Sequence, residues 1–264
     1  MKYFFPLLVF LIGCSTQPKS ILTDHSTADL QKIFEDENAN GCFVIYDLKN
    51  ETKLEYNSAR LDSTFLPAST FKIINSMIAL ETRVLQDEKE IIKWDSTDRG
   101  YDKWNRDQNL EIGIKYSAVW FYQELARRIG QEKMQHWVTA TNYGNNNING
   151  GIDVFWLSGD IRITPNQQID FLKRLYFNEL PFSKRNQEIV KKILIVEETP
   201  NYTIRAKTGW AARVPRQIGW YVGYLEKGED VYFFVINMDI KSSDDPPKRK
   251  RIVKRIFKNL KLTE

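Results

Sequence analysis

The sequence predicts a mixed α/β fold (α+β), with a central antiparallel sheet formed from both chain ends, flanking helices and an all-helical subdomain inserted in the middle. Segments rich in β-branched and aromatic residues occur near both ends of the chain, and the region between them has helical periodicity. No helical crossover separates the late strands, so we expect them to pair antiparallel. The 264 residues, 42% of them hydrophobic, suffice for one substantial core and one catalytic unit.

The N-terminus is expected to serve export. Residues 1–13 carry Lys2 and an apolar run, Tyr3–Ile12, that is too short to span a bilayer as a mature helix, which predicts a signal peptide. Leu11-Ile12-Gly13-Cys14 resembles a bacterial lipobox, whose cysteine would be lipidated; a conventionally cleaved signal is the alternative. Residues 14–29 are polar and predict a flexible tether ahead of a domain over 30–264. We therefore expect a periplasmic protein anchored to a membrane through Cys14.

The first strands are expected directly after this tether. The apolar run Gly41–Tyr46 is followed by the turn-like segment Asp47–Asn50, and Glu51–Tyr56 can pair back as a hairpin. Cys42 lies in the first of these strands. If Cys14 is lipidated, Cys42 is the remaining thiol, so we expect a small core residue and no intramolecular disulfide.

The middle of the chain has the periodicity of helices. Apolar residues recur there at spacings of three and four, which places them on one face of each helix. The predicted helices cover Phe71–Glu81, Ala118–Ile129, Glu132–Thr139, Asn166–Phe177 and Ser183–Ile195.

The last part of the chain returns to strands and ends in a helix. Thr203–Thr208, Ile218–Tyr224 and Val231–Met238 are predicted to be antiparallel neighbours. The basic run Lys248–Arg251 precedes apolar residues at helical spacing, so its cations are interpreted as the solvent-facing side of an amphipathic helix. No nucleic-acid-binding signature accompanies the run, and we predict no nucleic-acid partner.

The sequence does not favour catalysis by a histidine-based triad. The two histidines are His25, in the expected tether, and His136, within a predicted helix, and no catalytic motif surrounds either. With one usable cysteine, the sequence also offers no plausible zinc cluster, so no metal site is expected. Proton abstraction must therefore fall to a lysine, a carboxylate or a tyrosine.

The sharpest local signal is Pro67-Ala68-Ser69-Thr70-Phe71-Lys72, at the start of a helix that is apolar almost all round. Ser69 and Lys72 are three residues apart, so both project from one face of the first turn. Desolvation among apolar neighbours would lower the pKa of the Lys72 amine and leave it neutral and reactive. A surface lysine after a capping serine is the competing interpretation, because S-x-x-K alone is a weak signal.

Two further elements strengthen this signal. Ser117-Ala118-Val119 opens the next predicted helix, and Lys207-Thr208-Gly209 ends a predicted strand. In the order S-x-x-K, S-x-V, K-T-G, the three motifs resemble the penicillin-recognising serine enzymes. Tyr143-Gly144-Asn145 and Phe155-Trp156-Leu157 narrow the resemblance to class D (OXA-type) β-lactamases, from about Gly41 to the C-terminus. The resemblance implies a β-lactamase/transpeptidase-like fold.

The resemblance implies a serine β-lactamase that needs carbon dioxide or bicarbonate and no separate cofactor. Ser69 would be the acylated nucleophile, and Lys72 would be N-carboxylated and act as the general base. Trp156 would donate its indole N–H to that carbamate, whereas without the resemblance a plain core aromatic is favoured. Val119 and Leu157 would be apolar cover over it.

The resemblance also implies how a small β-lactam would be held. Ser117 would relay a proton to the leaving nitrogen, with Lys207 beside it. Arg249 and Thr208 would bind the substrate carboxylate, although a register error of one is open among four consecutive basic residues. The oxyanion hole would consist of backbone N–H groups of Ser69 and of Trp210, the residue after Gly209.

Two alternatives share this chemistry. A penicillin-binding D,D-peptidase would hydrolyse the β-lactam adduct slowly, and a β-lactam-acylated sensor would signal without turnover.

The polar segment with Asp102, Trp104 and Asp107 borders the cleft in one interpretation and is a solvated loop in the other. Substrate range stays open, as does the choice between a monomer and a homodimer, and the membrane is expected as a partner only through the lipid anchor.

Overall fold

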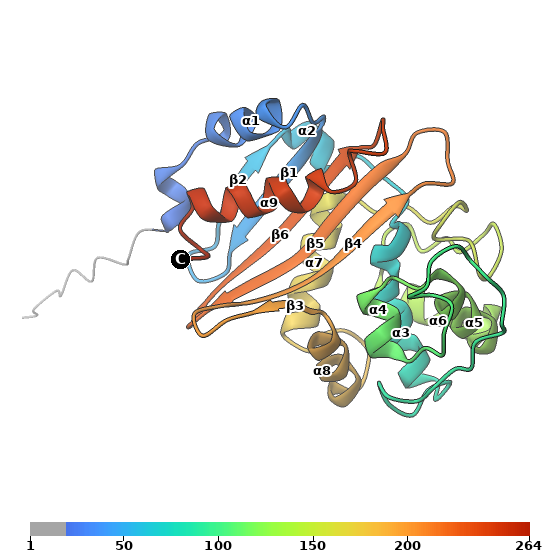
Figure 1. The fold of residues 1–264 in the computed structure, drawn as a ribbon. Helices are drawn as coiled ribbons and strands as arrows, with labels where there is room; N and C mark the ends of the chain where they lie inside the picture. The colour runs from blue at the N-terminus through green and yellow to red at the C-terminus, as the bar shows by residue number, and fades with distance from the viewer. Residues whose placement is uncertain (1–19) are drawn as a thin grey trace, which may run out of the picture.

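The computed structural model describes residues 20–264 (Figure 1). The predicted signal peptide and the lipidation of Cys14 lie outside the described residues. No helix within 20–264 is long and apolar enough to cross a bilayer.

A six-stranded antiparallel sheet forms the centre of the molecule, in the order β2-β1-β6-β5-β4-β3 (Figure 1). The hairpin from the start of the domain joins the late strands through β1 and β6, where Val44 pairs with Val235. The sheet is therefore built from both chain ends, and the predicted fold class is confirmed. The strands are β1 (Gly41–Asp47), β2 (Thr52–Tyr56), β3 (Ile195–Glu198), β4 (Thr203–Ala211), β5 (Ile218–Lys227) and β6 (Asp230–Asp239).

Both faces of the sheet are covered. Along β6, Phe233 and Val235 belong to one apolar core, whereas Phe234 and Ile236 belong to the other, because side chains alternate between the faces of a strand. Helices α1 (Thr27–Asp36) and α9 (Lys248–Asn259) cover the second face (Figure 1). The predicted amphipathic C-terminal helix is thus present, with its apolar side on the sheet.

The first core continues into the helical part of the chain between β2 and β3. Helix α7 (Pro165–Tyr176) packs on β5 and β6, and α3 (Lys72–Glu81) lies among the other helices with nine of its ten residues buried. This inserted helical region agrees with the prediction. The remaining elements there are α2 (Ser58–Leu61), η2 (Ala68–Phe71), α4 (Leu110–Lys115), α5 (Val119–Ile129), α6 (Gln131–Thr141) and α8 (Lys184–Ile193).

The structure differs from the expected tether over 14–29. Its described part, residues 20–29, is folded: a 3-10 turn, η1 (Ile21–Asp24), is followed by α1 from Thr27. Ser20 is buried and donates a 2.6 Å hydrogen bond to Asp47. Side-chain hydrogen bonds, which leave no periodic signal in the sequence, hold this segment in place. The domain therefore includes residues 20–29, and not only 30–264.

Candidate active site

Ser69 lies in η2, immediately before α3. The preceding residue, Ala68, is fully buried with a φ of 48°, a left-handed conformation that is uncommon outside glycine. Gly209 of β4 packs against this turn, since a Cβ there would lie 3.0 Å from the Pro67 carbonyl oxygen. The close packing of β4 against the segment that carries the nucleophile therefore favours glycine at position 209, whether or not a substrate also approaches the strand there.

The Lys72 amine is next to the Ser69 hydroxyl. Lys72 is fully buried, and its Nζ donates to Ser69 Oγ at 2.7 Å and to Ser117 Oγ at 3.2 Å. Burial holds the pKa of Lys72 well below its usual value, and the charges of Lys207 and Arg213 lower it further. Such a pKa favours the neutral amine, which can act as a nucleophile or a base.

Ser117 lies between two amines. It occupies the turn between α4 and α5 with a φ of 55°, just ahead of the helix that was expected to begin at Ala118. Lys207, buried in β4, also donates to Ser117 Oγ, at 3.0 Å. Burial, with the charges of Arg249 and Lys250, lowers the pKa of Lys207 to about 7. Four side chains from three separate motifs thus form one hydrogen-bonded chain from Ser69 through Lys72 and Ser117 to Lys207.

Trp156 is a fully buried aromatic residue with an unpaired donor. Its ring stacks on Phe71 with centroids 5.5 Å apart. Its Nε1 has no hydrogen-bond partner within the described part of the chain. A buried donor without an acceptor costs about 1–3 kcal/mol, so Trp156 Nε1 is suited to donate to an acceptor group bound at the site.

A cleft of about 370 Å³ opens over Ser69. The predicted substrate-binding residues come together here, whereas Lys72, Lys207 and Trp156 lie buried behind its wall. Ala212 and Arg213 also line the cleft, as does Trp104 from the polar segment that was one candidate for its border. The lining consists of Ser69, Trp104, Ser117, Val119, Leu157, Thr208, Gly209, Trp210, Ala212, Arg213 and Arg249.

Arg249 is the residue of the basic run that reaches the cleft. Its guanidinium donates to the Gly209 carbonyl oxygen, and its stem crosses Gly219, where a Cβ would lie 2.8 Å from Arg249 Cδ. Lys248 instead pairs with Asp245 at 2.8 Å. Of the basic run, Arg249 is thus the residue whose side chain lies in the cleft lining. Burial lowers the pKa of Arg249 to about 10, which leaves it charged at neutral pH.

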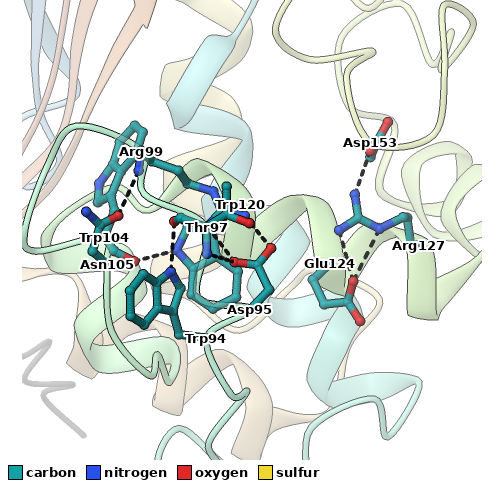
Figure 2. Close-up of polar contacts among 10 residues, drawn as sticks. All are labelled: Trp94, Asp95, Thr97, Arg99, Trp104, Asn105, Trp120, Glu124, Arg127 and Asp153. Carbon is teal, nitrogen blue, oxygen red and sulfur yellow. Dashed lines mark hydrogen bonds and ion pairs between the residues drawn. The ribbon is translucent and has the colours of Figure 1, made fainter.

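Trp104 lines the cleft, and its indole and its backbone are both held by hydrogen bonds, the second of which Figure 2 draws. Its indole donates to the Tyr116 carbonyl oxygen at 2.9 Å, next to Ser117, and its own carbonyl accepts from Trp120 Nε1 at 2.8 Å. The Arg99 guanidinium lies over the Trp120 ring at 5.2 Å, and Asp95 holds it with two hydrogen bonds of 2.7 and 2.8 Å. The polar segment that contains Asp95, Arg99 and Trp104 is therefore held in place by these contacts, and it positions Trp104 in the cleft lining.

A second group of ion pairs holds Asp153, three residues before Trp156 (Figure 2). Arg127 of α5 binds Glu124 on its own helix at 2.9 Å and Asp153 at 2.6 Å. Asp102, by contrast, is exposed and outside the cleft lining, and Asp107 binds Lys93. Of the three residues singled out in the polar loop, Trp104 alone lines the cleft. Its aromatic type within a polar segment was the available signal.

Replacing Trp120 by phenylalanine should loosen the Trp104 wall. The substitution keeps the aromatic ring under Arg99 but leaves the Trp104 carbonyl oxygen without its 2.8 Å donor. Loss of a hydrogen bond of about 1 kcal/mol predicts a KM about fivefold higher for substrates that contact Trp104. Steady-state kinetics measure this, with the melting temperature as a control; an unchanged KM would contradict the role of the brace.

Comparison with known proteins gives a consistent result. The family model described as penicillin binding protein transpeptidase domain matches residues 41–258. The chain is 44% identical to β-lactamase OXA-48 of Klebsiella pneumoniae, over 87% of this chain and 86% of that protein. It is 39% identical to β-lactamase OXA-10 of Pseudomonas aeruginosa, over 98% of each.

Solved structures of class D β-lactamases also resemble this chain. A class D β-lactamase, YbXI, from Nostoc superposes with a TM-score of 0.86 at 47% identity, covering 88% of this chain and 98% of that one. FUS-1 (OXA-85), a class D β-lactamase from Fusobacterium nucleatum, gives a TM-score of 0.88 at 40% identity, covering 91% and 100%.

Proposed function

Because this chain belongs to the class D (OXA-type) β-lactamases of the transpeptidase domain family, we propose that it opens the β-lactam ring of penicillins and related antibiotics through an acyl-enzyme on Ser69, with Lys72 N-carboxylated by carbon dioxide. The observation that carries the proposal is the buried Lys72 amine, 2.7 Å from Ser69 Oγ. Neither histidine lines the cleft.

The surroundings of Lys72 fit a carbamate. A neutral amine is required to add carbon dioxide, and the lowered pKa of Lys72 supplies it. Trp156 Nε1 is a buried donor that needs an acceptor, which a carbamate oxygen would provide. When bound there, the carbamate would supply a general base for the Ser69 hydroxyl and later for the hydrolytic water.

The other residues act on the reacting atoms. Ser69 Oγ bonds to the lactam carbonyl carbon, the C–N bond breaks, and Ser117 passes a proton to the ring nitrogen. Lys207 holds the Ser117 hydroxyl in place through its 3.0 Å hydrogen bond. Water then cleaves the ester, which releases the ring-opened acid and restores Ser69.

Residues of the cleft wall would bind the substrate and stabilise the negative charge that develops on its carbonyl oxygen. The backbone N–H groups of Ser69 and Trp210 would stabilise the oxyanion, where one donor is worth about 2.7–4 kcal/mol of the barrier. Thr208 and Arg249 would hold the substrate carboxylate, for which the guanidinium is suited. Val119 and Leu157, both in the cleft lining, would exclude bulk water.

The test of this function is turnover of a chromogenic cephalosporin by the purified protein. Sustained hydrolysis over many equivalents is the expected result. One equivalent of released product followed by no further reaction would support the alternative, a D,D-peptidase or a β-lactam-acylated sensor, and would overturn the proposal.

Activity should also depend on pH and bicarbonate. As pH falls below the pKa of Lys72, the amine binds a proton and can no longer hold carbon dioxide, so activity should decline on the acid side. Removal of bicarbonate should have the same effect, and added bicarbonate should restore the rate. Initial rates from pH 5 to 9, with degassed and bicarbonate-supplemented buffers, measure this; indifference to bicarbonate at every pH would argue against the carbamate.

We further propose that the protein acts in the bacterial periplasm, anchored through a lipid on Cys14. The sequence Leu11-Ile12-Gly13-Cys14 supports this assignment. Mass spectrometry of the mature N-terminus tests it: a diacylglyceryl-modified Cys14 would agree with the proposal, and an unmodified N-terminus at another residue would refute it.

A further inference from the structure

A second cavity, of about 520 Å³, lies beside the catalytic cleft. It occupies the space bordered by α4, the end of α8, the start of β3, and the edge of β4. We call it the lysine groove. Its floor is apolar and includes Ile114, Ile195 and Val196, the last of which is 49% exposed. The groove can therefore contact the apolar part of a ligand.

Cations surround this floor. Lys115, Lys192, Lys207 and Lys250 line the groove, against one acidic lining residue, Glu111. Lys192 has a carboxylate partner, Glu88, at 3.5 Å. Within residues 20–264, neither Lys115 nor Lys250 has a carboxylate within salt-bridge distance, and both are exposed. Their charge is available to an anionic ligand.

The groove and the catalytic cleft share a wall. Thr208 lines both cavities, and Lys207, which binds Ser117, lines the groove. In the proposed function, Thr208 and Arg249 hold the ring carboxylate of the β-lactam. A substituent on the ring carbon next to the carboxylate-bearing carbon would therefore start at Thr208, where the cleft meets the groove.

We propose that the lysine groove is a subsite for an acidic substituent on the carboxylate side of the β-lactam, recognised by Lys115 and Lys250. This inference rests on the proposed function and specifies one of its substrate classes. The apolar floor contacts the stem of the substituent, and the two exposed ammonium groups attract its terminal anion. Because both cations are exposed, the attraction should weaken as ionic strength rises.

The test uses two cephalosporins that differ only in that substituent, which ends in a carboxylate in one and in a carboxamide in the other. The wild-type enzyme should have a KM about threefold lower for the acid than for the amide at low salt, and this preference should shrink at high salt. Lys115→Gln and Lys250→Gln should each reduce the preference, and the double variant should abolish it. Glu111→Gln should increase it.

Lys258→Gln is the matched control, because Lys258 is also an exposed lysine of α9 but does not line the groove. Its acid-to-amide ratio should equal that of the wild type. Equal KM values for the two compounds in the wild type, or a preference that survives in the double variant, would overturn the subsite while leaving the hydrolase intact. If neither compound were hydrolysed, the proposed function would fail and the subsite with it.

Discussion

Replacing Lys72 by alanine should lower turnover by about 100- to 10,000-fold, the range expected for loss of a general base. The Lys72 amine is within hydrogen-bonding distance of both Ser69 and Ser117, and no other titratable side chain contacts Ser69 Oγ in the described part of the chain. Without Lys72, acylation slows and hydrolysis of the ester on Ser69 slows further, because no base activates the water. The protein should accumulate as a covalent adduct, detected by mass spectrometry after incubation with a penicillin.

Two controls make this result specific. Ser69→Ala should give no adduct at all, which shows that the trapped species is on Ser69. Lys191→Ala removes another lysine of low exposure, whose Nζ binds the Tyr176 carbonyl oxygen outside the cleft, and it should turn over normally if it folds. A turnover rate of the Lys72→Ala enzyme within tenfold of the wild type, with no accumulated adduct, would refute the assignment of the base.

Replacing Trp156 by phenylalanine should cost about ten- to a hundredfold in turnover, because a hydrogen bond to a charged group is worth about 1.5–3 kcal/mol. The phenyl ring keeps an aromatic surface against Phe71 and removes the Nε1 donor together with part of the indole ring. The carbamate on Lys72 would then be less stable. We therefore expect the bicarbonate concentration for half-maximal activity to rise, and saturating bicarbonate to restore much of the rate.

The melting temperature separates this effect from general damage to the core. In the protein without carbamate, Nε1 of Trp156 is buried and unpaired, so loss of the donor itself costs no stability, and a lower melting temperature reports the space that the smaller ring leaves. A Trp156→Phe enzyme with wild-type bicarbonate dependence would contradict the proposed hydrogen bond. The matched aromatic variant is Trp220→Phe, since Trp220 donates to the Leu66 carbonyl oxygen at 2.9 Å, and it should lose stability without a change in bicarbonate dependence.

The parts of the fold that sequence patterns predict are those with strong local signals. β4 to β6 are runs of β-branched and aromatic residues, and α9 has a strictly amphipathic pattern. β3 was not expected: it has four residues, and Ile195 was assigned to the end of the preceding helix. Short elements at a sheet edge depend on tertiary pairing, here with β4, and their own residues carry little signal.

The features of the active site likewise divide into those that a local sequence pattern predicts and those that depend on packing. The proximity of Ser69 and Lys72 follows from a spacing of three residues at the start of a helix. Lys207 meets Ser117 across 90 residues, and only the ordered set of motifs indicated that pairing. The cation–π contact of Arg99 with Trp120 and the lysine groove are formed by residues that have no motif and are distant in sequence. Such features emerge only when the elements pack.

The most direct test is ¹³C NMR of the protein equilibrated with ¹³C-labelled bicarbonate. A single carbamate resonance should appear in the wild-type enzyme, decline on acidification in parallel with activity, and be absent in Lys72→Ala. A fully active wild-type enzyme without such a resonance, or one whose resonance persists when Lys72 is replaced, would contradict the carboxylation of Lys72.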